Sequence, residues 1–390
     1  MKVRLGDIAV LINGDRGKNY PSQADIMEDG DIPFVNAGHL TGREVSFEDM
    51  NYISKEKYDS LNAGKFCKGD ILYCLRGSLG KKALVEDEIV GAIASSLVII
   101  RTNEQNVDRK YLMFSLDSPS IKEQLMKANN GSSQPNLSAA SVKQYEIDLP
   151  DLHNQINIVE RLIKVRNVID IRKQELEKLD ELIKARFVEL FGDAVHNDKG
   201  WVTDTVDNLC KEIYGGGTPS KAHPEYYEDG DIPWVSSKDM KTDVLIDSQI
   251  KINQLGVDNS TARMVPANSV IMVIRSGILK HTLPVAINAV PITVNQDLKV
   301  FIPSKRILTR FLAVQFKMHE KDILTGVRAV TADNIEFNSL KQRELIVPPV
   351  ELQQEYIEFI EQVDKSKVAV QKSLDEAQLL FDCLMQKYFG

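Results

Sequence analysis

The sequence predicts a mixed α/β protein in which two related α/β globular domains are separated by two long helices that form an antiparallel coiled coil. Three observations predict this fold: a heptad pattern over residues 152–192, a second copy of most features about 198 residues later, and short β-branched runs within each copy. A chain of 390 residues is too long for one ordinary core and suits two domains with a connector.

The heptad pattern of residues 152–192 is typical of a coiled-coil helix. Gly192 is expected to cap its C-terminus, and Pro150 precedes its start. About forty residues at about 1.5 Å each make a rod of roughly 60 Å. Arg172 and Arg186 interrupt the second line of the seam, where polar residues can fix register. The apolar seam consists of Leu162, Val165, Ile169, Leu176, Leu179, Ile183 and Leu190.

An internal repeat sets the order of the chain. The segment EDGDIPFV at residues 28–35 returns as EDGDIPWV at residues 228–235, and the strand-like residues 70–76 match residues 269–275. The helical pattern also returns, with Phe389-Gly390 answering Phe191-Gly192, and its seam is Ile360, Val363, Lys367, Val370, Leu374, Ala377, Phe381, Leu384 and Tyr388. The order is therefore globule, helix, globule, helix, at residues 1–149, 150–192, 198–347 and 348–390.

Each globule is predicted to contain mainly strands. Short β-branched runs at residues 97–100, 270–274 and 298–302 lie between Gly, Asn, Asp and Pro clusters, which favours strands. Residues 111–127 and 310–324 each have the pattern of one amphipathic helix. The repeated Asp-Ile-Pro is interpreted as a turn into a buried strand, with Phe34 and Trp234 in the core.

The two long helices have an obvious partner in each other. Because the connection between them is a whole globule, an antiparallel pair is sterically simpler than a parallel one. That pair relates the two halves by a pseudo-twofold axis. The alternative is that each helix packs only on its own globule.

Composition limits the functions that the chain can have. The net charge is −8 and the pI is near 5.5, so any anion-binding function must depend on local patches. No apolar run is long enough for a membrane span, and Asp7 interrupts the apolar N-terminal stretch, so no signal peptide is expected. The four cysteines lack metal-ligand spacing, which favours reduced thiols in a cytoplasmic protein.

The sequence predicts no active site, no metal site and no bound cofactor in this chain. It lacks a phosphate-binding G-x-x-x-x-G-K-[ST] loop, an H-E-x-x-H zinc motif and a G-x-S-x-G nucleophile elbow. Asp297-Leu298-Lys299 offers only a fragment of the carboxylate cluster that a metal-dependent nuclease needs, and the alternative is a strand with one exposed acid and one exposed base.

Turn-like segments that combine cations, amides and small polar residues occur in both globules. Arg, Asn and Gln can read base edges, whereas Lys, Ser and Thr can hold phosphates. Arg76 and Arg275 are the strongest candidates because each follows an apolar strand at an equivalent position; the alternative is that each pins a loop to Glu28-Asp29 or its counterpart. The candidate DNA-contacting residues are Arg16, Lys18, Asn36, His39, Arg76, Ser78, Lys81, Gln134, Asn136, Thr218, Ser236, Ser237, Lys238, Arg275, Lys280 and Arg328.

Aromatic residues near the helix ends fall outside the seam. Phe187 and Phe191 lie beside it, and Phe389 occupies the matching place in the second helix, with Met385 one turn before it. Exposed apolar side chains at these positions would suggest docking, either onto the neighbouring globule or onto another protein. The four residues are therefore candidates for subunit docking.

The arrangement of the whole chain resembles the specificity subunit of Type I restriction-modification systems. The resemblance depends on the double repeat, the GDIPW-like segments, GGTPS at residues 216–220, LFGD at residues 190–193, and a strand that ends in Arg-Gly or Arg-Ser. It covers essentially the whole chain. Its strength lies in the repeat more than in any one motif.

The resemblance implies a function for each part. In that family each globule reads one half of a split double-stranded DNA target, and the helices form an antiparallel coiled coil that fixes the gap. The helices also recruit two modification subunits, which carry the S-adenosylmethionine chemistry, and motor-nuclease restriction subunits join that core with ATP and Mg. By position, residues 1–149 and 198–347 would be target-recognition domains. The chain starts at its first globule and stops at the second Phe-Gly, so contacts that other members make through longer ends are not expected here.

Two other functions remain open from the sequence. One is an enzyme, such as a bifunctional DNA methyltransferase or nuclease in which one globule is degenerate. The other is a protein-interaction scaffold whose globules bind partners other than DNA. For a DNA reader, a rigid rod between two globules measures the distance between half-sites, which on one face of DNA lie about 10–10.5 bp apart.

Overall fold

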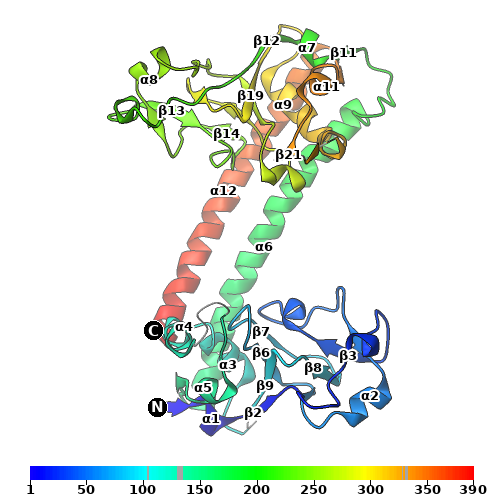
Figure 1. Ribbon diagram of the computed structural model, residues 1–390, viewed down its shortest axis with the longest axis vertical. Helices are drawn as coiled ribbons and strands as arrows, with labels where there is room; N and C mark the ends of the chain where they lie inside the picture. Colours follow the sequence, from blue (N-terminus) through cyan, green and yellow to red (C-terminus); the bar gives the residue numbers. More distant parts are fainter. Residues whose placement is uncertain (103–104, 130–134, 327, 330–332) are drawn as a thin grey trace. The chain divides into compact units, whose positions relative to one another are not determined.

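The computed structural model describes residues 1–102, 105–129, 135–326, 328–329 and 333–390. Contacts divide the chain into a first unit, Met1–Lys173 with Gln371–Gly390, and a second unit, Gln174–Val370. Each unit contains one globular domain and a segment of both long helices, α6 (Leu152–Phe191) and α12 (Val350–Phe389) (Figure 1). Each long helix is therefore divided between the two units. The four segments predicted from the sequence instead follow the repeat and keep each helix whole.

The first globule contains two four-stranded sheets. One has the order β2-β9-β6-β7, which is antiparallel throughout, and the other has the order β4-β3-β8-β5, in which β3 and β8 are parallel. A short pair, β1-β10, ties the N-terminus to the end of the domain. These strands are β1 (Lys2–Arg4), β2 (Ala9–Asn13), β3 (Ile32–Val35), β4 (Tyr52–Ile53), β5 (Lys65–Phe66), β6 (Ile71–Cys74), β7 (Lys82–Leu84), β8 (Gly91–Ile93), β9 (Leu97–Thr102) and β10 (Glu146–Asp148).

The second globule repeats this arrangement. Its main sheet has the order β12-β19-β16-β17-β14, and a second sheet has the order β15-β13-β18, with β13 and β18 parallel. The strands are β11 (Thr203–Thr205), β12 (Cys210–Gly215), β13 (Ile232–Val235), β14 (Val244–Leu245), β15 (Lys251–Ile252), β16 (Val270–Val273), β17 (Val285–Asn288), β18 (Thr293–Val294), β19 (Leu298–Pro303) and β22 (Glu344–Ile346), with a hairpin of β20 (Arg328–Ala329) and β21 (Asp333–Asn334).

The predicted strands and core residues are confirmed. β6 and β16 are buried along their whole length, which explains their continuous apolar sequences. The repeated Asp-Ile-Pro leads into β3 and β13, and Phe34 and Trp234 are buried there with exposed fractions of 4% and 6%. The shared orders β2-β9-β6-β7 and β12-β19-β16-β17, and β4-β3-β8 and β15-β13-β18, show that the sequence repeat is a structural repeat, although β14 and β5 have no counterpart in the other half's sheets.

The prediction of one amphipathic helix per globule is wrong, because each region contains two. The first globule has α3 (Arg109–Ser115) and α4 (Pro119–Ala128), and the second has α9 (Thr309–Met318) and α10 (Glu320–Thr325). Pro119 cannot continue a preceding helix, and the Ser118 hydroxyl accepts a hydrogen bond from the backbone N–H of Ile121 to start a new one. Shorter helices complete the domains: α1 (Leu5–Ile8), α2 (Lys55–Ser60), α5 (Ala139–Lys143), α7 (Val206–Leu209), α8 (Gln254–Asp258) and α11 (Phe337–Lys341).

The long helix α6 begins and ends where the sequence predicted. The Asp151 carboxylate accepts a hydrogen bond from the backbone N–H of Asn154 at 2.9 Å, which caps the N-terminus. At the other end Gly192 has φ +76°, a left-handed conformation that favours glycine, and its N–H bonds to the Val188 carbonyl at 2.8 Å.

A buried glutamine fixes the start of each long helix to the globule before it. Gln155 accepts a hydrogen bond from the N–H of Asp108 at 2.9 Å and donates to the carbonyls of Asn106 and Pro150. Gln353 repeats all three bonds, and both side chains are fully buried. We call this arrangement the glutamine latch (Gln155 or Gln353 with its three backbone partners). Because the latch satisfies backbone groups of both elements, it fixes where the helix leaves the domain.

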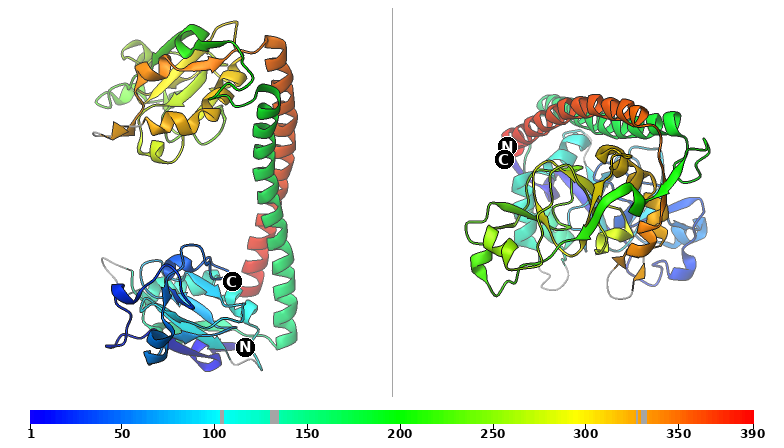
Figure 2. Two further views of the ribbon diagram at one scale, coloured as in Figure 1. Left: turned by 90° about the vertical axis from the view of Figure 1, so that its right-hand side faces the viewer. Right: turned by 90° about the horizontal axis from the view of Figure 1, so that it is seen from above.

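The two long helices run in opposite directions within each unit (Figure 2). In the second unit Lys367 pairs with Asp180 at 2.5 Å and Arg186 pairs with Glu355 at 2.8 Å, so residue numbers rise along one helix as they fall along the other. The predicted role of the polar seam residues Lys367 and Arg186 therefore has a structural basis: both make ion pairs between the helices. In the first unit Arg161 donates to the hydroxyl of Tyr388 at 3.1 Å.

The predicted exposure of the residues near the helix ends is wrong. Phe187 and Phe191 have no exposed area and pack against Phe311 of α9, at ring-centroid distances of 5.9 and 4.9 Å. Met385 and Phe389 are also buried, and Phe389 lies 5.1 Å from the ring of Tyr111. Of the two alternatives, docking onto the globule of the same unit is the one observed. Apolar rings beside a seam are buried when a globule covers that face of the helix.

Candidate DNA interface

Several predicted DNA-contacting loops of the first globule lie side by side. The loop after β6 is joined to residue 96 by a hydrogen bond from the Leu75 N–H to the Ser96 carbonyl at 2.8 Å. On its other side the Leu137 N–H bonds to the Leu75 carbonyl at 2.8 Å, and Arg76 and Asn136 form a β-bridge. The Arg76 side chain is exposed and has no side-chain partner among the residues that the structure describes. Its guanidinium is therefore available to a ligand at this surface.

Other cations extend the same group of loops. Arg16 donates to the Ser95 carbonyl at 3.3 Å, and Lys81 donates to the Gly38 carbonyl at 3.5 Å, which ties the loop after β6 to the loop after β3. Lys18 and Ser78 are exposed. Asp15 holds the turn that carries Arg16. Its carboxylate accepts a hydrogen bond from the backbone N–H of Gly17, and this bond is the main cause of the lowered pKa of Asp15.

The assignment of His39 to DNA contact is wrong for the folded chain. His39 is 6% exposed, and its Nδ1 accepts a hydrogen bond from the backbone N–H of Asn36 at 3.1 Å. Its Nε2 lies 3.2 Å from the Asp49 carbonyl, so both ring nitrogens are occupied. Asn36 is half-buried, and its side-chain oxygen accepts from the Gly38 N–H at 2.7 Å. Both residues hold a turn, because Asn and His side chains can replace backbone partners there.

The second globule places Arg275 at the position of Arg76. The Ile274 N–H bonds to the Asp297 carbonyl at 2.9 Å, the Ile335 N–H bonds to the Ile274 carbonyl at 2.9 Å, and Arg275 and Asn334 form a β-bridge. The Arg275 side chain is paired with Asp297 at 2.7 Å and is still 49% exposed. The predicted alternative, a loop-pinning contact with the counterpart of Glu28-Asp29, is therefore replaced by a contact with Asp297.

The remaining candidates of the second globule lie in turns. Thr218 is exposed and donates its hydroxyl proton to Gln296, which precedes Asp297. Ser236 donates to the Asp239 carboxylate at 2.8 Å, so its hydroxyl holds a turn. Ser237 is half-buried, Lys238 is exposed, and Lys280 is the exposed last residue of a 3-10 turn, Gly277–Lys280.

Two candidates fall wholly or partly beyond what the structure describes. Gln134 lies outside the described residues. The backbone of Arg328 belongs to β20, and its side chain lies outside the description. Their predicted role in DNA contact stays a prediction.

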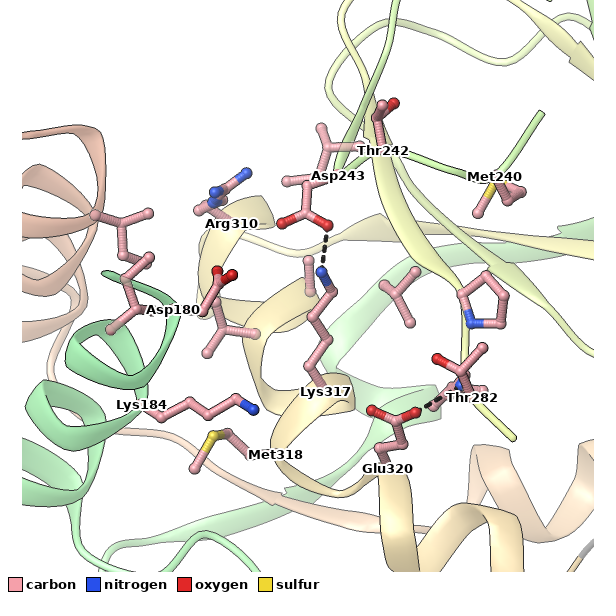
Figure 3. A pocket seen from close by; sticks show the side chains of 18 of the residues that line it. Asp180, Lys184, Met240, Thr242, Asp243, Thr282, Arg310, Lys317, Met318 and Glu320 are labelled. Carbon is pink, nitrogen blue, oxygen red and sulfur yellow. Dashed lines mark hydrogen bonds and ion pairs between the residues drawn. The ribbon is translucent and has the colours of Figure 1, made fainter. Parts of the chain in front are cut away.

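The second unit also contains a pocket of about 700 Å³ (Figure 3). The close-up shows an ion pair between Lys317 and Asp243, and a hydrogen bond from the Leu283 backbone to Glu320. Asp180, the third carboxylate of the lining, pairs with Lys367. Each of the three lining carboxylates is thus already paired. Within the described ranges, no group of three or more His, Cys, Asp or Glu side chains could hold a metal ion, and no helix is long and apolar enough to cross a membrane.

Comparison with known families assigns this architecture. The family described as the Type I restriction modification DNA specificity domain matches residues 1–181 and again residues 198–377. The chain belongs to this family. Its specificity domain is present twice, so the resemblance predicted from the sequence is confirmed, and DNA-sequence specificity is the function of the chain.

Curated relatives carry the same description. The chain is 37% identical to the specificity subunit of the Type I restriction enzyme EcoR124I/EcoR124II of Escherichia coli, over 39% of this chain and 38% of that protein. It is 22% identical to the MjaIX specificity subunit of Methanocaldococcus jannaschii, over 92% of this chain and 86% of that protein. The first match covers less than half of either protein, and the second covers most of both.

Solved structures show that the fold is shared. The S subunit of a Type I restriction-modification system from M. genitalium matches with a TM-score of 0.59 at 14% identity, covering 100% of this chain and 96% of that one. A chain from a structure of Type I R-M complex assembly matches with a TM-score of 0.58 at 17% identity, covering 100% and 97%. The predicted fold class, two mixed α/β domains with long antiparallel helices, is therefore confirmed.

Proposed function

We propose that each globular domain of this specificity chain reads one half of a bipartite double-stranded DNA target, and that α6 and α12 set the gap between the halves. The observation that carries the proposal is the repeated joint: each globule is followed by a 40-residue helix whose first turn is fixed by a glutamine latch. A reader that is rigidly joined to a helix can transmit the length of that helix to the DNA.

The reading surface of each domain is proposed to be the group of loops around the bridged arginine. Arg76 and Arg275 follow equivalent buried strands, and each is bridged to an asparagine, Asn136 or Asn334. Arginine and asparagine make bidentate contacts with guanine and adenine in the major groove, and the neighbouring lysines can neutralise phosphates. The local surface can therefore bind DNA although the chain as a whole has a net charge of −8.

We further propose that two modification subunits and the restriction subunits assemble on this chain in the cytoplasm, and that they supply S-adenosylmethionine, ATP and Mg chemistry. The chain itself would then be non-catalytic. Methyl transfer or DNA cleavage by the purified chain alone, with these cofactors added, would contradict this part of the proposal.

Exposed apolar side chains on the long helices are the proposed docking positions, in place of the buried residues near the helix ends. The proposed positions include Val168, Ile171, Leu379 and Leu380 in the first unit, and Leu182 and Val368 in the second unit. Apolar side chains on the outer face of a helix pair favour contact with a partner protein. Ile171→Glu with Leu379→Glu should weaken co-purification of a modification subunit. The control Lys164→Glu, at an exposed polar position of α6, should leave it unchanged.

Methylation sequencing of cells with and without this chain and its modification subunits tests the bipartite target directly. The expected result is a split motif with a fixed gap. Inserting seven residues into α6 after Lys173 and seven into α12 after Val370 should lengthen the gap by about three base pairs, because seven helical residues add roughly 10 Å. The sequences of both half-sites should stay the same. A change in either half-site would show that the helices are not the ruler.

Exchange of one globule tests whether each domain reads independently. Replacing residues 1–149 with the first globule of another family member should alter one half of the motif and leave the other half and the gap unchanged. If both halves change together, the two domains do not read separately.

A further inference from the structure

The loops that carry Arg76 and Arg275 are equivalent in backbone and different in side chains. In both globules the residue before the arginine donates its N–H to one loop and accepts a hydrogen bond at its carbonyl from another. Leu75 donates to residue 96 and accepts from residue 137, and Ile274 donates to residue 297 and accepts from residue 335. This pattern aligns Ser96 with Asp297 in space.

Arg275 is held by the Asp297 carboxylate. Its Nε lies 2.8 Å from Asp297 Oδ1, and one terminal nitrogen, Nη2, lies 2.7 Å from the same oxygen. The arginine side chain is still 49% exposed, whereas the carboxylate is 25% exposed. One edge of the guanidinium is thus occupied, and its end remains at the surface.

Asp297 is in turn held by a buried residue. Asn295 is 7% exposed, and its side-chain Nδ2 donates to the Asp297 Oδ2 at 3.1 Å. The Asn295 side-chain oxygen accepts from the Asp297 N–H at 3.1 Å, and the Asn295 N–H bonds to the Val235 carbonyl of β13 at 2.9 Å. Both carboxylate oxygens therefore have a fixed partner, and the chain of contacts runs from the core to the exposed guanidinium.

The first globule lacks this chain of contacts. Ala94, whose N–H bonds to the Val35 carbonyl at 2.8 Å, stands where the second globule has Asn295, and Ser96 stands where it has Asp297. Neither residue can hold a guanidinium as a carboxylate does, and Arg76 has no side-chain partner within the described part of the chain. The restraint on the arginine is therefore a property of the second globule.

The remaining donors of Arg275 define what it can bind. A guanidinium has five N–H donors in a planar fork. With Nε donating to Asp297 Oδ1 and Nη2 close to the same oxygen, the two protons of Nη1 and the outer Nη2 proton are left at the exposed end. That fork matches the O6 and N7 acceptors of guanine in the major groove. Because Asp297 cancels the charge of the arginine, attraction to phosphates in general is reduced relative to base contact.

We propose that Asp297 is a positioning residue that determines specificity: it holds Arg275 end-on toward one guanine of the second half-site. The inference rests on the proposed function, since it assumes that the second globule reads DNA. Arg275 is fixed before binding and loses little rotamer freedom when it meets the base, whereas Arg76 must be ordered by its ligand. The second domain is therefore expected to discriminate at this base more sharply than the first domain does at the base facing Arg76.

The test uses the full chain assembled with its modification subunits, and duplexes that carry the methylation motif. Each guanine of the second half-site is replaced in turn by 7-deazaguanine, which keeps its pairing and loses the N7 acceptor. For the wild-type complex, the replacement at one of these positions should lower the affinity for the duplex by about tenfold. In D297S, which introduces the residue of the first globule, and in D297N, the penalty at that position should fall below about threefold. Effects in the first half-site should not change.

A matched control and three outcomes make the test decisive. E212Q removes another surface ion pair of the same globule, between Glu212 and Arg263 at 2.6 Å, and should leave the penalty at tenfold. An equal loss of affinity of D297S for all sequences would overturn the proposal, because Arg275 would then contact phosphate. Wild-type discrimination in both variants would also overturn it. Absence of sequence-specific binding by the wild-type complex would instead contradict the proposed function itself.

Discussion

The two units make the same joint between globule and helices with charges of opposite sign. In the repeat, Arg43 is equivalent to Asp243 and Asp117 is equivalent to Lys317. Arg166 of α6 is likewise equivalent to Asp364 of α12. The backbone confirms the first of these equivalences, since the carbonyls of Arg43 and Asp243 accept hydrogen bonds from β7 and β17, from Leu84 and Ile287 respectively. The glutamine latch, by contrast, is identical in the two units.

The partners of these charges explain how inversion is tolerated. In the first unit Arg43 pairs with Asp170 of α6, and Asp117 pairs with Lys82. In the second unit Lys317 pairs with Asp243, and Arg310 pairs with Asp364 at 2.9 Å. The other five charges thus each keep a complementary partner within their unit, whereas Arg166 lies over the rings of Phe114 and Phe381. The sign at these positions can therefore change where a partner of opposite charge is present, whereas the latch is the same in both units.

The largest effect is expected from breaking the latch, because it is the part that the two units share. Gln353→Leu removes three hydrogen bonds and leaves buried backbone groups without partners, so the free energy of unfolding of the second unit should fall by about 4 kcal/mol. Both tryptophans, Trp201 and Trp234, belong to the second unit, so urea denaturation followed by tryptophan fluorescence reports it selectively.

The adjacent residue provides the control for the latch. Gln354 is exposed, and Gln354→Leu should change the free energy of unfolding by less than about 0.5 kcal/mol. Gln155→Leu should reproduce the large loss in the first unit, measured by hydrogen exchange of its peptides. Equal stability of the Gln353 and Gln354 variants would show that the latch does not stabilise the joint.

Asp117 and Lys317 occupy equivalent positions in the two units, but their replacement by alanine should change the free energy of unfolding by different amounts. Lys82, the partner of Asp117, is 2% exposed, and burial lowers the pKa of its ammonium group. Asp117→Ala leaves that buried charge unpaired and should cost about 3 kcal/mol in the first unit, measured by hydrogen exchange. Lys317→Ala, in a pair whose members are 38% and 54% exposed, should cost less than about 1 kcal/mol. Similar losses for the two variants would contradict this difference in burial.

Acid should destabilise the second unit through a residue that the first unit lacks. His319 is 2% exposed between α9 and α10, and burial lowers its pKa to about 4, while Pro119 stands at the matching position of the first unit. Below about pH 6.5 the unfolded imidazole gains a proton that the folded one does not, so stability falls as pH drops from about 6.5 to 4, by at most about 3 kcal/mol.

The variant His319→Gln isolates this contribution. It should flatten the decrease in the free energy of unfolding over that pH range, measured by tryptophan fluorescence in urea at a series of pH values. His281→Gln, at an exposed histidine of the same unit, should leave the decrease unchanged. An unaltered slope in the His319 variant would mean that other groups cause the acid sensitivity.

The smallest effect is expected for the exposed ion pair of the first unit. Arg43 and Asp170 are 52% and 32% exposed, and the hydrogen bond between them raises the pKa of Arg43 and lowers that of Asp170. A double-mutant cycle with Arg43→Ala and Asp170→Ala should give a coupling free energy below about 1 kcal/mol, and less at high salt. A coupling of several kcal/mol would show that this pair, and not the latch, holds the joint.

Some of the candidate site could be predicted from the sequence and some could not. The equivalence of Arg76 and Arg275 follows from the repeat, because both come after the same buried strand. The burial of His39 did not follow, since a histidine in a polar turn has the same local pattern whether it holds the turn or contacts a ligand. The latch residues carried a signal that the sequence interpretation missed, a glutamine five residues after Pro150 and again after Pro348.

Period, turn residues and apolar runs are local properties of the chain, and they were enough to predict the repeat, the main buried strands, the long helices and their caps. Tertiary structure decided which side chains are available. It buried Phe187 and Phe191 against Phe311, and it placed Asp297 against Arg275 from 22 residues away. Contacts of that kind depend on which loops the sheets bring together. The pairing of strands, and not the spacing of residues, sets that arrangement.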